Sequence, residues 1–156
     1  MASALSTVAQ ECDAATRAAR QRLVAAVRQA AADGMSQKQI AAEIGRSQPE
    51  VSRLLRFHGT SPLGRRLRQA RPQIRHAINA AGGSKVRVFG SVAAGTDDDN
   101  SDVDLLFHMG EPLSLMELSA LELELQRIIG ARVDLVADTA IRPTMRSRIL
   151  SEAVPL

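Results

Sequence analysis

Apolar residues recur at helical spacing through the first third of the chain. Residues 13–32 form an Ala-rich segment with one apolar side, which predicts a long helix. Asp33-Gly34 follows it and is typical of a helix C-terminus. Residues 36–44 and 47–56 then predict two short helices, separated by Gly45, which permits a tight turn.

Both short helices begin with the residues of a capping box. Ser36 is followed three positions later by Gln39, and Ser47 by Glu50. In this pattern the serine side chain accepts from the backbone N–H of the residue three positions later, whose own side chain accepts from the serine N–H. This exchange fixes where the helix begins.

The pattern changes after residue 82, where short β-branched runs alternate with helical ones. The predicted strands cover 86–89, 103–107 and 132–136, and the predicted helices cover 65–81, 113–129 and 142–153. Pro72 should begin or kink the first of these helices. The predicted fold class is α+β, with two domains: an all-α domain at 1–58, a Gly/Ser/Pro linker at 59–64, and an α/β domain with a short mixed sheet at 65–156.

Composition restricts the class of protein. The chain of 156 residues has one cysteine, Cys12, so it cannot form an internal disulfide, and a reducing cytoplasm is expected. We expect neither a signal peptide nor a membrane span, because no apolar run approaches the roughly 20 residues that a span needs.

Charge is divided unevenly along the chain. Residues 1–75 hold 13 Arg and Lys against 5 Asp and Glu, a net of +8, whereas residues 76–156 hold 7 against 12, a net of −5. A basic first half suits a polyanionic partner such as nucleic acid, although Arg-rich helices can also be simply solvated. An acidic second half suits metal binding.

Residues 36–56 resemble the helix-turn-helix of bacterial repressors, whose second helix enters the DNA major groove. Ala41 is small where the helices cross, although Arg46 stands where the family usually has an apolar residue. A helical hairpin for packing or dimerisation is the alternative. If the resemblance holds, the chain binds operator DNA as a homodimer. The predicted DNA-binding residues are Gln48, Pro49, Ser52, Arg53 and Arg56.

Two carboxylates at the entry of the second predicted strand carry the candidate chemistry. Asp102 and Asp104 are two residues apart, so both should point to one face. Two carboxylates at such a short distance repel each other unless a cation lies between them, and Mg²⁺ prefers oxygen ligands of this kind. Asp134 lies in the third strand, where an unpaired charge is costly, and can supply a third ligand.

Gly90-Ser91, ten residues and Asp102-Val103-Asp104 together resemble the signature of the DNA polymerase β-like nucleotidyltransferases. In its short form the chain is similar to the minimal nucleotidyltransferases often encoded beside HEPN-type toxins. The resemblance implies that Gly90 and Ser91 contact a triphosphate. It further implies that two Mg²⁺ ions are held by Asp102, Asp104 and Asp134, and that Asp134 acts as general base.

With the helix-turn-helix, this resemblance implies an antitoxin that transfers AMP from ATP to a cognate toxin and represses its own operon. One departure is Ala94, where the family often has Arg, and its loss could weaken nucleotide binding. Two other functions stay open: a transcription regulator whose inactive domain senses nucleotide, and a toxin that acts on tRNA. Lys85 and Arg87 are candidates for a basic rim, and strand alternation predicts that only one of them faces the site.

Overall fold

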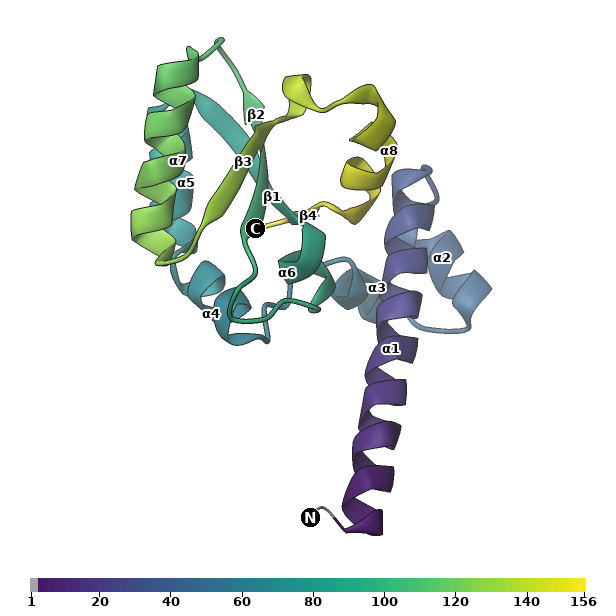
Figure 1. Cartoon of the computed structure of the whole chain (residues 1–156). Coiled ribbons are helices and arrows are strands. Elements are labelled where there is room, and N and C mark those ends of the chain that lie inside the picture. Colours follow the sequence, from purple (N-terminus) through teal and green to yellow (C-terminus); the bar gives the residue numbers. More distant parts are fainter. Residues whose placement is uncertain (1–2) are drawn as a thin grey trace. The chain divides into compact units, whose positions relative to one another are not determined.

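The computed structural model describes residues 3–156, which form two compact units (Figure 1). The first unit is Met1–Leu55 and the second is Arg56–Leu156. No helix among the described residues combines the length and the apolarity that a membrane span requires.

The first unit is helical throughout and contains α1 (Ala4–Ala32), α2 (Gln37–Ile44) and α3 (Gln48–Leu54). Its core is small and lies where the three helices meet. The buried residues are Val27, Ile40, Ala41, Val51 and Leu54. Ala41 is therefore buried at the helix crossing, as its size predicts.

Both predicted capping boxes are confirmed. The Ser36 hydroxyl accepts from the Gln39 amide and the Gln39 side chain accepts from the Ser36 amide; Ser47 and Glu50 repeat this arrangement. Gly45 ends α2 with φ +65°, a left-handed conformation that glycine adopts without a steric penalty.

Helix α1 begins nine residues earlier than predicted, at Ala4, after a cap from Ser3. The added residues 4–12 are exposed apart from half-buried Ser6, so packing within the first unit does not hold this part of the helix. The Ser3 cap and helix-forming residues such as Ala4, Leu5 and Ala9 favour it locally.

The second unit begins with α4 (Pro62–Gln69) and α5 (Arg71–Ala80). The segment 59–64, predicted as a linker, instead contains the first turn of α4, because Ser61 caps a helix that begins with Pro62. The predicted single helix at 65–81 is divided at Ala70, and Pro72 lies in the first turn of α5, as a helix-starting proline should.

A four-stranded mixed sheet forms the centre of this unit, as predicted. It contains β1 (Gly83–Phe89), β2 (Val103–Met109), β3 (Val133–Ala137) and β4 (Val154–Pro155), in the order β3-β2-β1-β4. β2 pairs with β3 in parallel and β1 pairs with both its neighbours antiparallel. β4 was not predicted, since two residues give no alternating pattern.

The two faces of the sheet are covered differently (Figure 1). α5 and α7 (Leu115–Ile129) pack on one face, against alternate residues such as Val88, Leu105 and Leu135. α8 (Pro143–Glu152) covers part of the other face through Ile149, which packs with Phe89 and Leu106. The α8 face therefore keeps uncovered positions where polar side chains can lie.

Candidate active site

The predicted carboxylates lie on the α8 face, across neighbouring strands. Asp104 of β2 is the register partner of Phe89 in β1 and of Asp134 in β3. Because Asp104 and Asp134 pair in a parallel register, their side chains leave the same face of the sheet side by side. The strand pairing therefore brings together two carboxylates that are 30 residues apart in sequence.

Gly90 closes one side of this carboxylate pair. It follows β1 and has φ +70°, and a Cβ atom there would collide with Asp104 Oδ2. Both the backbone conformation and the space therefore require glycine. The Gly90 backbone contacts the Asp104 carboxylate in a way that no other residue would allow.

Ser91 and Ala94 lie on α6 (Gly90–Ala94), a short helix that follows β1 directly. Ser91 is half-buried, and its hydroxyl makes no hydrogen bond with any described residue. Ala94 is exposed and is followed by Gly95 in a left-handed conformation. The methyl group of Ala94 leaves this end of the site without the guanidinium that the family often places there.

Among the three carboxylates, Asp104 has the raised pKa. Burial and, after it, the negative charges of Asp134, Asp102 and Glu152 together raise its pKa to about 6, while Arg148 acts in the opposite direction. A carboxyl that is desolvated and repelled by neighbouring carboxylates is stabilised when it binds a proton or a cation.

Asp102 is directed elsewhere. Its Oδ1 accepts from Arg132 Nε at 2.9 Å, in an ion pair whose side chains are 46% and 77% exposed respectively. Among the described residues no three acidic, His or Cys side chains converge closely enough to hold a metal as they stand. The predicted three-carboxylate site is therefore assembled by the backbone but not by the Asp102 side chain.

Three charged residues of this site gave no signal in the sequence. Arg132 is a strand-edge residue, and it faces Asp102 only because β2 and β3 are parallel and in register. Arg148 and Glu152 are one turn apart on α8, at 3.7 Å from Nε to Oε1, and both act on Asp104. Their helix is placed by the tertiary fold, which no local pattern reveals.

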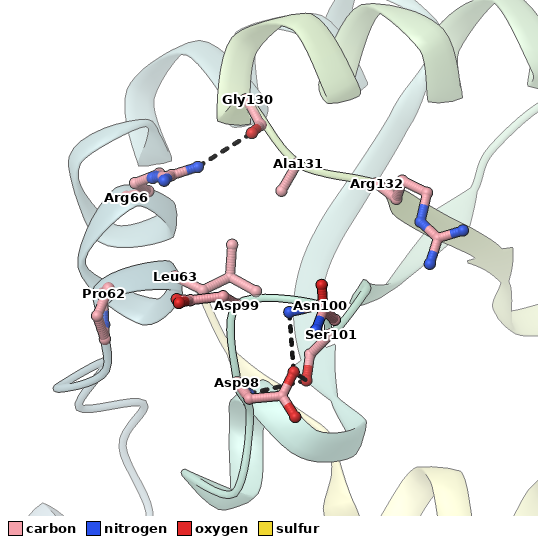
Figure 2. A pocket seen from close by; sticks show the side chains of 10 residues that line it. All are labelled: Pro62, Leu63, Arg66, Asp98, Asp99, Asn100, Ser101, Gly130, Ala131 and Arg132. Atoms are coloured by element: carbon pink, nitrogen blue, oxygen red, sulfur yellow. Dashed lines mark hydrogen bonds between the residues drawn. The ribbon is translucent and has the colours of Figure 1, made fainter.

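Arg132, the partner of Asp102, lines a cavity of about 530 Å³ (Figure 2). It lies between α4, the polar loop that leads into β2, and the turn between α7 and β3. Arg66 donates to the Gly130 carbonyl at 3.0 Å on one side, and Asp98 accepts from the Asn100 amide at 2.8 Å on the other. Its size suits a small ligand, but Asp104 and Asp134 do not line it.

Residues 67–156 match the family described as "Nucleotidyltransferase domain". The chain belongs to this family. The matched range contains Gly90, Ser91 and all three carboxylates, and it leaves the helical unit Met1–Leu55 outside.

Two relatives of this nucleotidyltransferase are named as protein adenylyltransferases. It is 38% identical over 73 residues to a "Putative protein adenylyltransferase" of Methanocaldococcus jannaschii, which covers 47% of this chain and 78% of the relative. It is 36% identical over 70 residues to "Protein adenylyltransferase MntA" of Thermococcus cleftensis, covering 45% and 71%. A solved structure described as a "putative minimal nucleotidyltransferase" is 37% identical and superposes with a TM-score of 0.55, covering 62% of this chain and 98% of that one.

The predicted DNA-binding residues occupy the first unit of this nucleotidyltransferase and its boundary. Gln48, Pro49 and Arg53 are exposed on α3, and Ser52 is half-buried. Arg56 lies two residues beyond the last residue of α3, so it does not extend the helix as predicted. Leu55 is the C-cap of α3, and its N–H still donates to the Val51 carbonyl at 3.1 Å.

The Asp104 carboxyl gives a pH prediction for the metal-free protein. Its pKa is about 6 when folded and near 3.9 when unfolded, so the folded state binds more protons between these values. Asp104 should therefore lower the free energy of unfolding as pH rises from about 4 to about 6. We expect Asp104→Asn to melt a few degrees above the wild type at pH 8, and the difference to vanish near pH 4.

The measurement is thermal melting with a chelator present, from pH 4 to pH 8. Glu124→Gln neutralises an exposed acid on α7 and should not alter this pH dependence. An Asp104→Asn curve parallel to that of the wild type would show that Asp104 is not destabilised.

Proposed function

We propose that this chain is a Mg²⁺-dependent protein adenylyltransferase of a toxin-antitoxin system, which transfers AMP from ATP to a hydroxyl of a cognate toxin. The observation that carries the proposal is the pairing of Asp104 with Asp134 beneath the Gly90 backbone. The names of two relatives support a protein acceptor. A HEPN-type toxin is the partner that the sequence resemblance favours.

The residues present fit magnesium. All three proposed ligands are carboxylates, the donor type that Mg²⁺ prefers, and Asp104 has the raised pKa of a group that a cation would stabilise. The Asp102–Arg132 pair is exposed, and such pairs contribute only about 0–1 kcal/mol. Rotation of Asp102 from Arg132 toward Asp104 is therefore cheap. Two bound ions would polarise the α-phosphate and stabilise the leaving pyrophosphate.

The chain's own residues would then orient the reactants. The Gly90 and Ser91 amides and the free Ser91 hydroxyl would hold the triphosphate. Asp134 is exposed and would accept the proton of the acceptor hydroxyl. The hydroxyl oxygen bonds to the α-phosphorus, the bond from that phosphorus to the bridging oxygen breaks, and pyrophosphate leaves.

The absence of an arginine at position 94 is compatible with activity, because other guanidinium groups lie near the carboxylates. Arg132 pairs with Asp102, and Arg148 lies close enough to lower the pKa of Asp104. Once Asp102 turns away, Arg132 is released for a phosphate oxygen. An inactive nucleotide sensor would not need the three carboxylates, and a tRNA-modifying toxin is the remaining alternative.

Incubation with ATP labelled at the α-phosphate tests the transfer. We expect label on the toxin protein, and a loss of at least about a hundredfold for Asp104→Asn or Asp134→Asn. Glu124→Gln is the matched control and should label as the wild type does. Label on tRNA would support the toxin alternative, and absence of label with Mg²⁺ the sensor. Full activity of Asp104→Asn would refute the metal assignment.

We also propose that the first unit binds the operator of its own operon. The support is local: both capping boxes, the left-handed Gly45 turn and the exposure of Gln48, Pro49 and Arg53. The first unit carries 7 Arg and Lys against 5 Asp and Glu, a net of +2, and residues 56–75 of the second unit add six more positive charges that would draw this part of the chain to phosphates.

A gel shift with the upstream DNA measures this binding. We expect a complex at low salt whose affinity falls steeply as salt rises. Gln48→Ala should cost roughly 1–3 kcal/mol on the operator and little on unrelated DNA, because a base contact carries sequence information. Gln29→Ala on α1 is the matched control; no complex at low salt would exclude operator binding.

A homodimer is the expected form of such a repressor, and one face of α1 could form its interface. Leu5, Val8, Cys12, Ala15 and Ala19 repeat at alternating spacings of three and four. Leu5 and Val8 are 83% and 55% exposed, and Cys12 is exposed. This spacing matches the a and d positions of a coiled coil, which would bury the stripe between two copies.

A parallel pairing of α1 places Cys12 opposite its copy. Mild oxidation should then convert the protein to a disulfide-linked dimer, seen on a non-reducing gel, and Cys12→Ser should abolish the link but not the dimer measured by light scattering. A monomer by light scattering would reject the homodimer.

A further inference from the structure

A second polar cleft lies on the sheet at the other end of the strands. Its volume is about 690 Å³, and its walls come from α5, β1, the end of β2 and the turn η1 (Asp138–Ala140). The polar residues that line it are Arg75, Asn79, Lys85, Arg87, His108 and Asp138. None of them belongs to the proposed active site.

The cleft is basic although the domain around it is acidic. Residues 76–156 carry a net charge of −5, yet Arg75, Lys85 and Arg87 converge here. No ion pair within 4 Å joins any of these three to an acid in the described chain. The one acid of the lining, Asp138, is held by His108 at 2.8 Å, which also lowers the Asp138 pKa, opposing its burial. The Arg75 guanidinium donates to Leu156 O at 2.7 Å, so Lys85 and Arg87 are the two positive charges of the lining that no described acid offsets.

An unusual backbone conformation produces this convergence. Lys85 is the one non-glycine residue with positive φ among the described residues, at +53°. The pairing of β1 with β2 is irregular between Ser84 and Arg87, where a bulge lies. The bulge interrupts the alternation of side chains, so both Lys85 and Arg87 line this cleft. Strain of this kind is retained where function uses it.

Part of the cleft lies on the α8 face with the carboxylates, because Asp104, Leu106 and His108 alternate on β2, whereas Arg75 and Asn79 reach it from α5. Asp104 and His108 are four residues apart on β2, which is roughly 13 Å at about 3.3 Å per residue. Ile149 of α8 packs on Leu106 between them. A protein segment whose hydroxyl lies at Asp134 therefore reaches the cleft by passing around α8.

We propose that this cleft binds an acidic segment of the protein acceptor, with carboxylates held by Lys85 and Arg87. The inference rests on the proposed protein acceptor and adds a determinant of its recognition. A protein segment fits better than RNA for two reasons. The aromatic ring of the lining, His108, is held by Asp138, and the site carboxylates Asp104 and Asp134 would repel a continuous polyanion.

Binding of a fluorescent peptide to the full chain tests this without ATP. One peptide has three glutamates four to six residues from a tyrosine, and its control has glutamines in their place. We expect the glutamate peptide to bind more tightly, and Lys85→Gly with Arg87→Gln to lose on the order of tenfold in affinity. Lys85→Gly removes the charge and relieves the positive φ, so the fold should survive.

Arg71→Gln with Arg127→Gln removes the same charge from exposed helix positions outside the cleft and should bind as the wild type does. Should the double variant of the cleft not fold, Lys85→Gly alone carries the comparison. Equal weakening in both doubles, equal binding of the two peptides, or selective binding of a single-stranded RNA through Lys85 and Arg87 would each overturn the proposal. Selective peptide binding in a protein that transfers no label would support the cleft and refute the transfer.

Discussion

The parallel register of β2 and β3 is the constraint on which the site depends. It fixes Asp104 beside Asp134, and β1 brings the Gly90 backbone against the same carboxylate. The arrangement is unfavourable on its own, since burial and neighbouring charges raise the pKa of Asp104 to about 6. The apolar pairs that flank each acid, such as Val103 with Val133 and Leu105 with Leu135, hold the strands together against that repulsion.

The charged side chains can lie on the sheet because helices cover only one of its faces completely. α5 and α7 bury the alternate residues of every long strand, which supplies most of the core. α8 covers the centre of the opposite face through Ile149 and Ile141 and leaves its two ends open. One end carries the carboxylates and the other carries the basic cleft, so a single face presents opposite charges along β2.

Much of this could be predicted from local sequence. Serine caps, glycine turns and apolar alternation are short-range signals, and they predicted α2, α3, α7, α8 and the three long strands close to their observed bounds. The rest depends on contacts distant in sequence. β4 exists only because Val154 meets Val88, and the Arg132–Asp102 pair only because β2 and β3 align. The bulge at Lys85 cancels an alternation rule that its neighbours obey.

The Asp102–Arg132 pair also bears on the meaning of Ala94. A guanidinium at position 94 would come from the same short helix as Ser91, whereas Arg132 and Arg148 come from β3's entry and from α8. Arg132 cannot pair with Asp102 and contact a phosphate at the same moment. We infer that metal binding by Asp102 and release of Arg132 are coupled, because the same rotation of Asp102 achieves both. In the proposed reaction, the Arg132 guanidinium would become available to the triphosphate only when a cation neutralises the carboxylates, so the cation and the guanidinium would not compete for Asp102.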